Sequence, residues 1–319
     1  MQEYTLPFFE SHHLLRTLAV QFCNGFSSKK VSSPMGVTSR PIFIVGSGRS
    51  GNTLLRRILM QGKQVIIPPE TYVLGEFFDK FIRYNYIKYK DLVHLCYSLI
   101  EYHPEFDTFS LPGLGELVHE QQKSHHSLSE LIEGFFLYYA SKHDSVGLRW
   151  GDKTPLNAFA IFRLATLFPQ AQFIHMIRNP VDVTSSYLDA KLYSNLESAT
   201  NRWLMAVSHI RRFQKKFPDS IYEVFYEELV TKPHECVEKI SNFLGLEYCA
   251  TMLKSDESLS MGDVKKHDHH SSVMKPITAG QIGKGYQKLT AKECHQIQDQ
   301  IVCNATIDMV DLLQHYHFL

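Results

Sequence analysis

The segment Phe43–Leu59, FIVGSGRSGNTLLRRIL, contains a glycine-rich loop of the kind that binds phosphate groups. Gly46–Gly51 fits the G-x-G-x-x-G pattern of dinucleotide-binding loops, and Gly46–Thr53 fits the P-loop pattern except that Asn52 replaces the lysine. Backbone N–H groups at the start of a helix, together with the helix dipole, attract an anion. The segment therefore predicts an anion site without the lysine that contacts a nucleoside triphosphate.

The sequence fits two other ligand classes, nucleoside triphosphates with Mg²⁺ and dinucleotides, less well. A P-loop enzyme needs a carboxylate at a neighbouring strand end to organise Mg²⁺, but the apolar run at 173–177 is followed by Arg178. A dinucleotide-binding fold needs an acid about twenty residues after the glycines. Glu70 has that separation, but Pro68 and Pro69 break the strand that would carry it. A nucleotide or small-molecule kinase of the P-loop class remains the alternative function, and a non-catalytic nucleotide-binding module is a further one.

A central parallel β-sheet flanked by helices is the fold that would position these residues. Short apolar, β-branched runs suited to buried strands alternate with segments of helical periodicity. Strands are expected at residues 41–45, 64–70, 171–177 and 220–225, and helices at 52–61, 156–168, 197–217, 234–245 and 290–313. Together with the anion loop, this pattern predicts an α/β fold of P-loop NTPase-like topology.

The remaining segments predict how the chain is divided. Residues 70–141 read largely as helix, with a capping box at Ser127–Glu130, and are expected to form a helical insertion. Residues 254–285 read as loop. Residues 1–40 are expected to form an N-terminal helical extension and linker, and residues 41–319 the main domain.

Composition excludes several partners. Lys plus Arg and Asp plus Glu number 33 each, so the chain has no general basic field for nucleic acid. The sequence lacks a long apolar run and a basic leader, so neither a membrane span nor a signal peptide is expected. The six cysteines form no C-x-x-C pair, which favours reduced thiols and a cytoplasmic location. No metal is expected, because the HDHH run at 267–270 reads as a solvated segment.

Four segments, in order, resemble the sulfotransferases that use 3′-phosphoadenosine 5′-phosphosulfate (PAPS), the broad family that includes protein-tyrosine sulfotransferases and many bacterial enzymes. RSGNTLL is similar to the family's R-S-G-T-T-L-L loop, and GDKTP to its K-x-P-type segment. FIHMIRNPVDVTSSYL resembles its 3′-phosphate motif, and VFYEELVTKP a segment whose tyrosine packs beside adenine. The resemblance runs from about Pro41 to Lys288, and it identifies the main domain as a sulfotransferase domain.

The resemblance implies how this chain would hold PAPS and its product, adenosine 3′,5′-bisphosphate (PAP). Arg178 and Ser186 would bind the 3′ phosphate, Tyr226 would lie beside the adenine, and Lys284 would contact a phosphate. The 5′ phosphosulfate would be held by Arg49, Ser50, Gly51, Asn52 and Thr53. An arginine that ends a buried strand could instead serve a structural ion pair.

Glu70 and Lys153 are the residues to which the resemblance gives catalytic roles. Glu70 would take the proton of an acceptor hydroxyl, and Lys153 would stabilise charge on the leaving oxygen, with Asp152 orienting it. Alternatively, Glu70 is an acid at a helix start and Lys153 lies in an exposed turn. Tyr72 replaces the arginine of the tyrosine sulfotransferases, which argues against a peptidyl-tyrosine acceptor. The acceptor, among carbohydrates, lipids, phenols and tyrosine, and the oligomeric state remain open.

Overall fold

A computed structural model of the chain describes residues 29–32, 39–123, 127–255, 262 and 275–319. Residues 1–28 and 33–38 of the N-terminal extension and the run at 267–270 lie outside these ranges, so the predictions for them stay untested. The strands are β1 (Ile42–Gly46), β2 (Val65–Ile66), β3 (Arg149–Lys153), β4 (Gln172–Ile177) and β5 (Ile221–Phe225). They pair in parallel in the order β2-β3-β1-β4-β5, which confirms the predicted sheet.

Helices cover both faces of this sheet and extend beyond its β2 edge. The helices are α2 (Asn52–Gln61), α3 (Leu74–Arg83), α4 (Tyr89–Glu101), α5 (Gly115–Gln121), α6 (Leu128–Lys142), α7 (Ile161–Leu167), α8 (Pro180–Asp189), α9 (Leu196–Lys216), α10 (Tyr226–Thr231), α11 (Pro233–Leu244), α13 (Lys284–Lys288), α14 (Ala291–Asn304) and α15 (Ile307–His315). Short 3₁₀ turns are η1 (Phe106–Phe109), η2 (Pro155–Phe159), η3 (Pro218–Ser220) and η4 (Ala250–Leu253).

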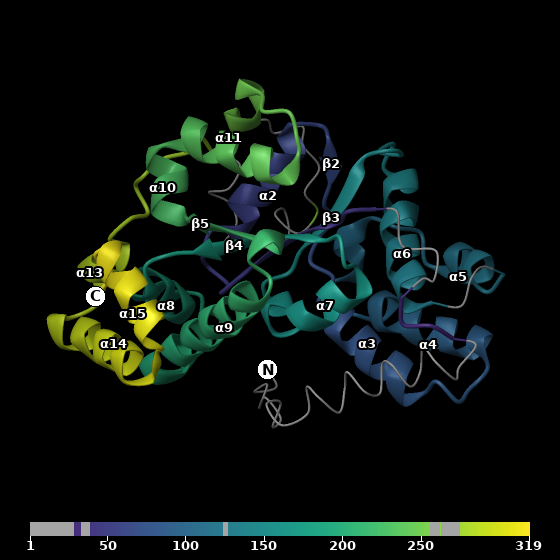
Figure 1. Cartoon of the computed structure of the whole chain (residues 1–319), viewed down its shortest axis with the longest axis horizontal. Coiled ribbons are helices and arrows are strands. Elements are labelled where there is room, and N and C mark those ends of the chain that lie inside the picture. Colours follow the sequence, from purple (N-terminus) through teal and green to yellow (C-terminus); the bar gives the residue numbers. More distant parts are fainter. Residues whose placement is uncertain (1–28, 33–38, 124–126, 256–261, 263–274) are drawn as a thin grey trace.

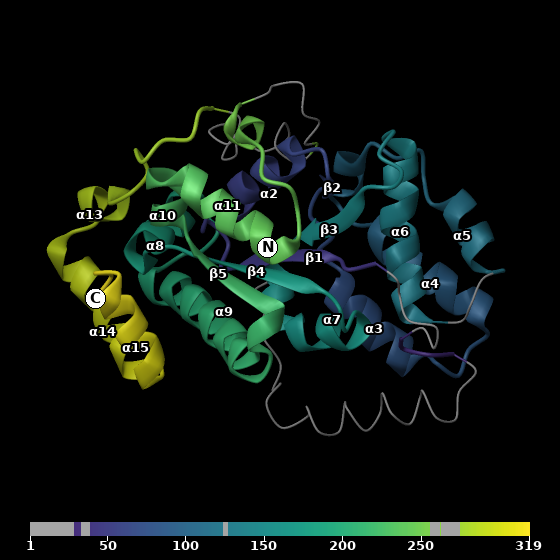
Figure 2. The same cartoon turned by 45° about the horizontal axis from the view of Figure 1, so that its top comes forward.

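Three layers are visible in Figures 1 and 2. Helices α2, α10 and α11 cover one face of the sheet, and α7, α8 and α9 cover the other. Helices α3 to α6 form the predicted helical insertion beside the β2 and β3 edge. Ser127 caps α6 as expected, because its Oγ accepts the N–H of Glu130 at 3.2 Å.

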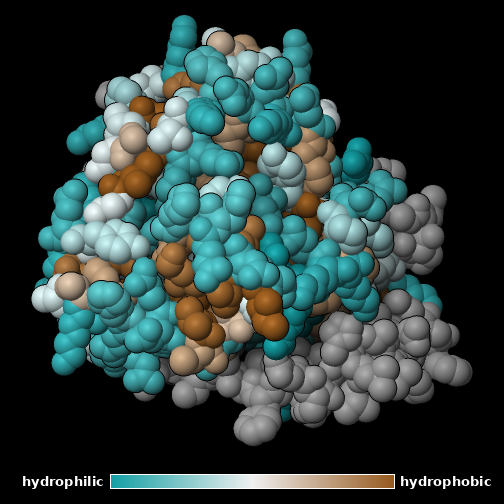
Figure 3. Space-filling view, turned by 60° about the vertical axis from the view of Figure 1, so that its left-hand side comes forward, coloured by the Kyte–Doolittle hydropathy of each residue, from teal (hydrophilic) through white to brown (hydrophobic). Residues whose placement is uncertain are grey.

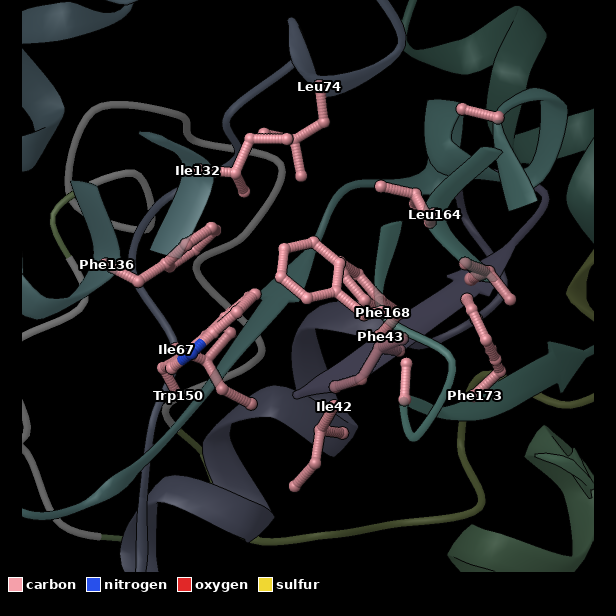
Figure 4. Close-up of a cluster of buried hydrophobic side chains, with 14 of the residues drawn as sticks. Ile42, Phe43, Ile67, Leu74, Ile132, Phe136, Trp150, Leu164, Phe168 and Phe173 are labelled. Atoms are coloured by element: carbon pink, nitrogen blue, oxygen red, sulfur yellow. The ribbon is translucent and has the colours of Figure 1, made fainter. Parts of the chain in front are cut away.

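The core joins the sheet to the insertion through aromatic rings (Figure 4). Trp150 of β3 stacks on Phe136 of α6, with ring centroids 4.2 Å apart, and meets Phe43 of β1 edge-on. Phe43 in turn stacks on Phe173 of β4. Because aromatic rings bury large apolar areas, this cluster stabilises strands β3, β1 and β4 and fixes where their carboxyl ends lie.

Strand β3 is the element that the sequence did not predict. Its residues, RWGDK, are mostly polar, yet all but Arg149 are buried. Propensity and periodicity give no strand here because Asp152 and Lys153 occupy positions that normally hold apolar residues. The strand forms because its neighbours β1 and β2 provide pairing partners on both sides.

The C-terminal segment forms two helices where the sequence predicted one. Helix α14 ends at Asn304, the backbone is extended at Ala305 and Thr306, and α15 begins at Ile307. Together with α8 and α9 these helices bury a second apolar cluster around Trp203 and Ile297. The side of the molecule that carries them is otherwise largely hydrophilic, with small groups of hydrophobic residues (Figure 3).

Candidate active site

The glycine-rich loop joins the end of β1 to the start of α2, as the sequence predicted. Asn52, which replaces the P-loop lysine, donates from Nδ2 to the carbonyl oxygen of Ser47 at 2.8 Å and so closes the loop on itself. Gly51 precedes the helix in a left-handed conformation and supplies no side-chain cap. The first N–H groups of a helix have no partners within it, so they are available to an anion at this end of α2.

Gly51 cannot be replaced without strain. Its φ is +93°, and a Cβ atom here would lie 2.6 Å from Cδ2 of Tyr226. We predict that Gly51→Ala lowers the free energy of unfolding by about 1–3 kcal/mol, because a left-handed conformation costs an L-residue about that much. Urea unfolding measures the effect. Gly115→Ala is the control, because nothing lies within 4 Å of the added Cβ there, and an equal loss in both variants would contradict the prediction.

Glu70, Lys153 and Thr53 lie together beside the loop. Lys153 Nζ is 2.5 Å from Oε1 of Glu70 and 3.3 Å from Oγ1 of Thr53. The Lys153 side chain is fully buried, whereas that of Glu70 is 14% exposed. Glu70 does not begin a helix, since α3 starts at Leu74, and Lys153 is not in an exposed turn. The cluster thus places a partly exposed carboxylate beside the loop, with a buried ammonium group next to it.

The Asp152 carboxylate makes its hydrogen bonds on the other side of β3 from Lys153, so an orienting role toward the lysine stays a prediction. Successive side chains of a strand point to opposite faces, so Lys153 faces α2 while Asp152 faces η2. The Asp152 carboxylate accepts hydrogen bonds from Thr71 Oγ1 at 3.1 Å and from Asn157 Nδ2 at 2.5 Å. Since Thr71 follows Glu70, Asp152 anchors the backbone that carries Glu70.

Burial raises the pKa of Asp152 to about 7, against the hydrogen bonds from Thr154 and Thr71 that lower it. The folded chain therefore binds a proton that the unfolded chain releases between about pH 4 and pH 7, so stability falls as pH rises through that window. We predict that Asp152→Asn flattens this slope in denaturant unfolding, whereas the exposed control Asp219→Asn keeps it. The same slope in Asp152→Asn and the natural chain would contradict the assignment.

Arg49, Arg178 and Ser186 meet at the other side of the loop. Arg49 Nε donates to Ser186 Oγ at 3.0 Å, and Arg178 donates to the carbonyl oxygens of Arg49 at 3.3 Å and Gln281 at 2.6 Å. The Arg178 guanidinium also lies 4.5 Å from the ring centroid of Tyr226 and 3.5 Å from a carboxylate oxygen of Asp182. The structure thus places the Arg49 guanidinium at Ser186, on the side expected to bind the 3′ phosphate.

Burial is the main cause that lowers the pKa of Arg49, and the nearby charge of Arg178 lowers it further, while Tyr187 and Glu70 oppose the change. Two guanidinium groups that repel each other in a partly buried site favour an anion between them. This side of the loop is therefore suited to an anion, as the anion site at the start of α2 is.

A cavity of about 810 Å³ connects the two clusters, a volume within the usual range for ligand pockets. Of the residues predicted from the sequence, those that line it are Arg49, Gly51, Asn52, Thr53, Glu70, Arg178, Ser186 and Tyr226. Ser50 and Lys153 are fully buried. Lys284 opens α13, whose first turn is held by Asp182, and is not among the residues that line the cavity.

Several buried polar atoms at the cavity have no hydrogen-bond partner among the residues that the structure describes. At residues that line the cavity these are Asn52 Oδ1 and Arg178 Nε, and Ser50 Oγ, in the loop beside it, is a further one. Buried polar atoms are nearly always paired in native proteins, so orphaned atoms around one cavity are typical of a polar ligand site. The arginines, the loop and these atoms fit a ligand with phosphate groups at both ends of the cavity.

Sequence reasoning missed Tyr187 and Arg202, which also line the cavity. The Tyr187 hydroxyl lies 2.8 Å from Ser47 Oγ and braces the loop, while the Arg202 guanidinium lies 4.4 Å from the ring centroid of Phe159. Tyr187 lies inside the quoted segment FIHMIRNPVDVTSSYL but was given no role there, and Arg202 belongs to no quoted segment; the positions of both follow from how α8 and α9 pack against the sheet. His175 is buried in β4, and its Nδ1 lies 3.1 Å from Oε1 of Glu223.

Other predictions concern metals, membranes and thiols. In the described ranges, no group of three His, Cys, Asp or Glu side chains is placed to hold a metal ion. Within the same ranges, none of the helices combines the length and apolar character that crossing a membrane requires. The cysteines that the structure describes, Cys96, Cys236, Cys249, Cys294 and Cys303, are free thiols. The cytoplasmic location stays a prediction.

The central strand, the glycine-rich loop and the helix after it define a P-loop-like α/β protein. Residues 41–250, more than half of the chain, match the sulfotransferase family, and the chain belongs to that family. Membership of this family indicates an enzyme that transfers sulfate.

Two relatives illustrate the range of the family. A putative protein-tyrosine sulfotransferase of Caenorhabditis briggsae is 25% identical over 222 residues, which cover 68% of this chain and 69% of the relative. The omega-hydroxy-beta-dihydromenaquinone-9 sulfotransferase Stf3 of Mycobacterium tuberculosis is 26% identical over 253 residues, which cover 66% of this chain and 64% of Stf3. This chain thus spans about two thirds of either relative's length.

A solved structure confirms the fold. The sulfotransferase domain from the Synechococcus PCC 7002 olefin synthase superposes with a TM-score of 0.59 at 21% identity. The match covers 87% of this chain and 100% of that domain. At this identity the likeness concerns the fold.

Proposed function

We propose that this protein transfers the sulfuryl group of PAPS to a hydroxyl acceptor, with Glu70 as general base. One observation carries the proposal: a carboxylate with a buried lysine and a pair of arginines converge on the same cavity, on opposite sides of a lysine-free phosphate loop. Family membership favours sulfuryl over phosphoryl transfer. The end of β4 carries Arg178 instead of the carboxylate that a kinase needs for Mg²⁺.

The residues present fit a nucleotide phosphorylated at both ends. The N–H groups at the start of α2, Thr53 and the buried Ser50 hydroxyl would hold the 5′ phosphosulfate. Arg49, Arg178 and Ser186 would hold the 3′ phosphate, because guanidinium groups match the oxygens of a phosphate with paired donors. Tyr226, whose ring lies against the Arg178 guanidinium, would lie beside the adenine.

Transfer would proceed in line at sulfur. The acceptor oxygen forms a bond to sulfur while the bond from sulfur to the 5′-phosphate oxygen breaks, and that oxygen leaves with the electron pair as part of PAP. Glu70 accepts the proton of the acceptor hydroxyl, and the Lys153 ammonium stabilises the negative charge that develops on the leaving oxygen. The fixed lysine would perform the charge stabilisation that Mg²⁺ provides in phosphoryl transfer.

A transfer assay with radiolabelled donors tests the proposal. The purified chain is incubated with PAPS labelled in the sulfate, a chelator and a panel of phenols, sugars and hydroxylated lipids, and in parallel with labelled ATP and Mg²⁺. We expect sulfated product from PAPS in the presence of the chelator, and no phosphorylated product from ATP and Mg²⁺. Phosphate transfer from ATP without sulfate transfer would replace this proposal with the kinase alternative.

A further inference from the structure

Arg202 is a cation at the cavity to which the proposed nucleotide contacts and the proposed transfer give no role. It comes from α9, lines the cavity and is partly buried. Among the residues that the structure describes, no carboxylate pairs with its guanidinium. Taking a charge out of water is costly unless an opposite charge compensates it. A partly buried guanidinium of this kind, at the wall of a ligand cavity, is therefore suited to an anionic group of a ligand.

Aromatic rings surround the Arg202 guanidinium. It lies 4.4 Å from the ring centroid of Phe159. Burial raises the pKa of Tyr187 and of Tyr193, and the positive charge of Arg202 opposes the change at both phenols, so the guanidinium is close to these two rings as well. The two tyrosine rings meet edge-on, with centroids 5.1 Å apart. Such contacts orient a guanidinium while leaving its charge in place.

The turn η2 places Arg202 on the side of the proposed catalytic pair. This turn carries Phe159 and begins two residues after Lys153, at the end of β3. Arg178 follows β4, and β1 lies between β3 and β4 in the sheet. Since Glu70 beside Lys153 must reach the acceptor hydroxyl, the acceptor occupies the part of the cavity next to η2.

Apolar surface accompanies the guanidinium in this part of the cavity. Leu156 of η2 lines the cavity, as do Leu192 and Tyr193 from the segment that joins α8 to α9. Leu192 is 44% exposed. Covering such surface favours binding of a ligand that has an apolar body.

The carboxylates that line the described part of the cavity come from other elements. They are Glu70, which follows β2 and lies next to Lys153, and Glu105, which belongs to the helical insertion. Arg202 instead meets η2, α8 and the segment after α8. A charge preference of the cavity thus depends on which of these groups the charged end of the acceptor reaches.

We propose that Arg202 binds a carboxylate of the acceptor, so that the protein favours hydroxyl compounds whose acid group is separated from the hydroxyl by a short apolar body. The reacting hydroxyl lies at Glu70, the acid lies at Arg202, and Leu156 and Tyr193 contact the body of the acceptor. A guanidinium matches the two oxygens of a carboxylate with paired donors. This inference rests on the proposed sulfuryl transfer.

Binding of three phenols to the PAP-loaded protein tests the inference without requiring turnover. Phloretate, para-ethylphenol and tyramine share one phenol and differ at the end of a short chain, which carries a carboxylate, no charge or an ammonium group. Each is titrated calorimetrically into the natural chain saturated with PAP. We expect affinity to fall in that order, with phloretate binding about tenfold or more tightly than tyramine, as a hydrogen bond between charged groups would give.

Three variants isolate the guanidinium. Arg202→Gln should bind the three phenols with nearly equal affinity. Arg202→Lys should keep part of the preference for phloretate, because it retains the charge but not the paired donors. Arg212→Gln is the matched control, since Arg212 is an exposed arginine of the same helix that does not line the cavity, and it should keep the whole preference. PAP affinity, measured on each variant, should equal that of the natural chain.

The outcomes distinguish this inference from the proposed function. Absence of phloretate binding, equal affinity for phloretate and tyramine, or tighter binding of tyramine overturns the inference while the nucleotide site stands. A preference for phloretate that persists in Arg202→Gln also overturns it. A loss of PAP affinity in Arg202→Gln but not in Arg212→Gln would assign Arg202 to the nucleotide instead. Failure of the natural chain to bind PAP would remove the proposed function and this inference together.

Discussion

Glu70→Gln is expected to lower the rate of sulfate transfer by about 10²–10⁴-fold, because a positioned general base contributes about that much. Glutamine keeps an oxygen that can accept from Lys153 Nζ, so the buried ammonium retains a partner and the site keeps its shape. The substitution therefore removes the proton acceptor with little other change. PAP affinity should stay at the natural value, since no proposed nucleotide contact involves Glu70.

The measurement is single-turnover transfer from labelled PAPS, alongside titration of PAP. Glu76→Gln on α3 is the matched control, because Glu76 is exposed and pairs with Lys80 one helical turn away. Its rate should be that of the natural chain. If Glu70→Gln turned over as fast as Glu76→Gln, another group would have to take the proton, although the fold and the nucleotide contacts would be unaffected.

Lys153→Met should lower kcat by about 10²–10³-fold, the usual loss when one preorganised group that stabilises transition-state charge is removed. Methionine fills the volume of the lysine stem in a fully buried position, so the loss is of charge rather than of packing. The variant also leaves the Glu70 carboxylate without the ammonium at 2.5 Å. We expect kcat to fall by a larger factor than the affinity for PAP.

Lys142→Met is the control for this prediction. Lys142 and Glu116 form an exposed pair at 2.7 Å, and exposed pairs contribute little to stability or activity. We expect its kcat to match the natural chain. If Lys153→Met reduced PAP affinity as much as kcat, the lysine would hold the nucleotide in its ground state, and its role in the transition state would be refuted.

The parts of the site that the sequence predicted are those encoded by local pattern. A β-branched run, glycines and a helix start at 42–61 specify strand, loop and helix without help from the rest of the chain. Arg178 was noted because it directly follows a buried apolar run, whereas Tyr226 came from the resemblance of its segment to the sulfotransferases, and the structure places it directly after β5. The parallel sheet flanked by helices was predicted from the same alternation of strands and helices.

The parts that were missed depend on tertiary contacts. Strand β3 carries buried Asp152 and Lys153, whose polarity hides the strand until partners for both side chains are known. Arg202 reaches the cavity from the middle of α9 only because that helix packs beneath the sheet. Glu105, in the helical insertion, also lines the cavity because of how that insertion packs. The position of each of these residues depends on tertiary packing, which the periodicity of the sequence does not predict.

The central claim is that this fold grips an adenosine nucleotide through its 3′ phosphate as well as its 5′ group, without a divalent ion. The most direct test is calorimetric titration with PAP and with AMP, which lacks the 3′ phosphate, in the presence of a chelator. The natural chain and Arg178→Gln are compared. We predict that the natural chain binds PAP about 10–100-fold more tightly than AMP, the value of a charge-assisted hydrogen-bonded contact, and that Arg178→Gln loses most of this preference. Equal affinity for PAP and AMP, or binding of ATP only when Mg²⁺ is added, would contradict the account.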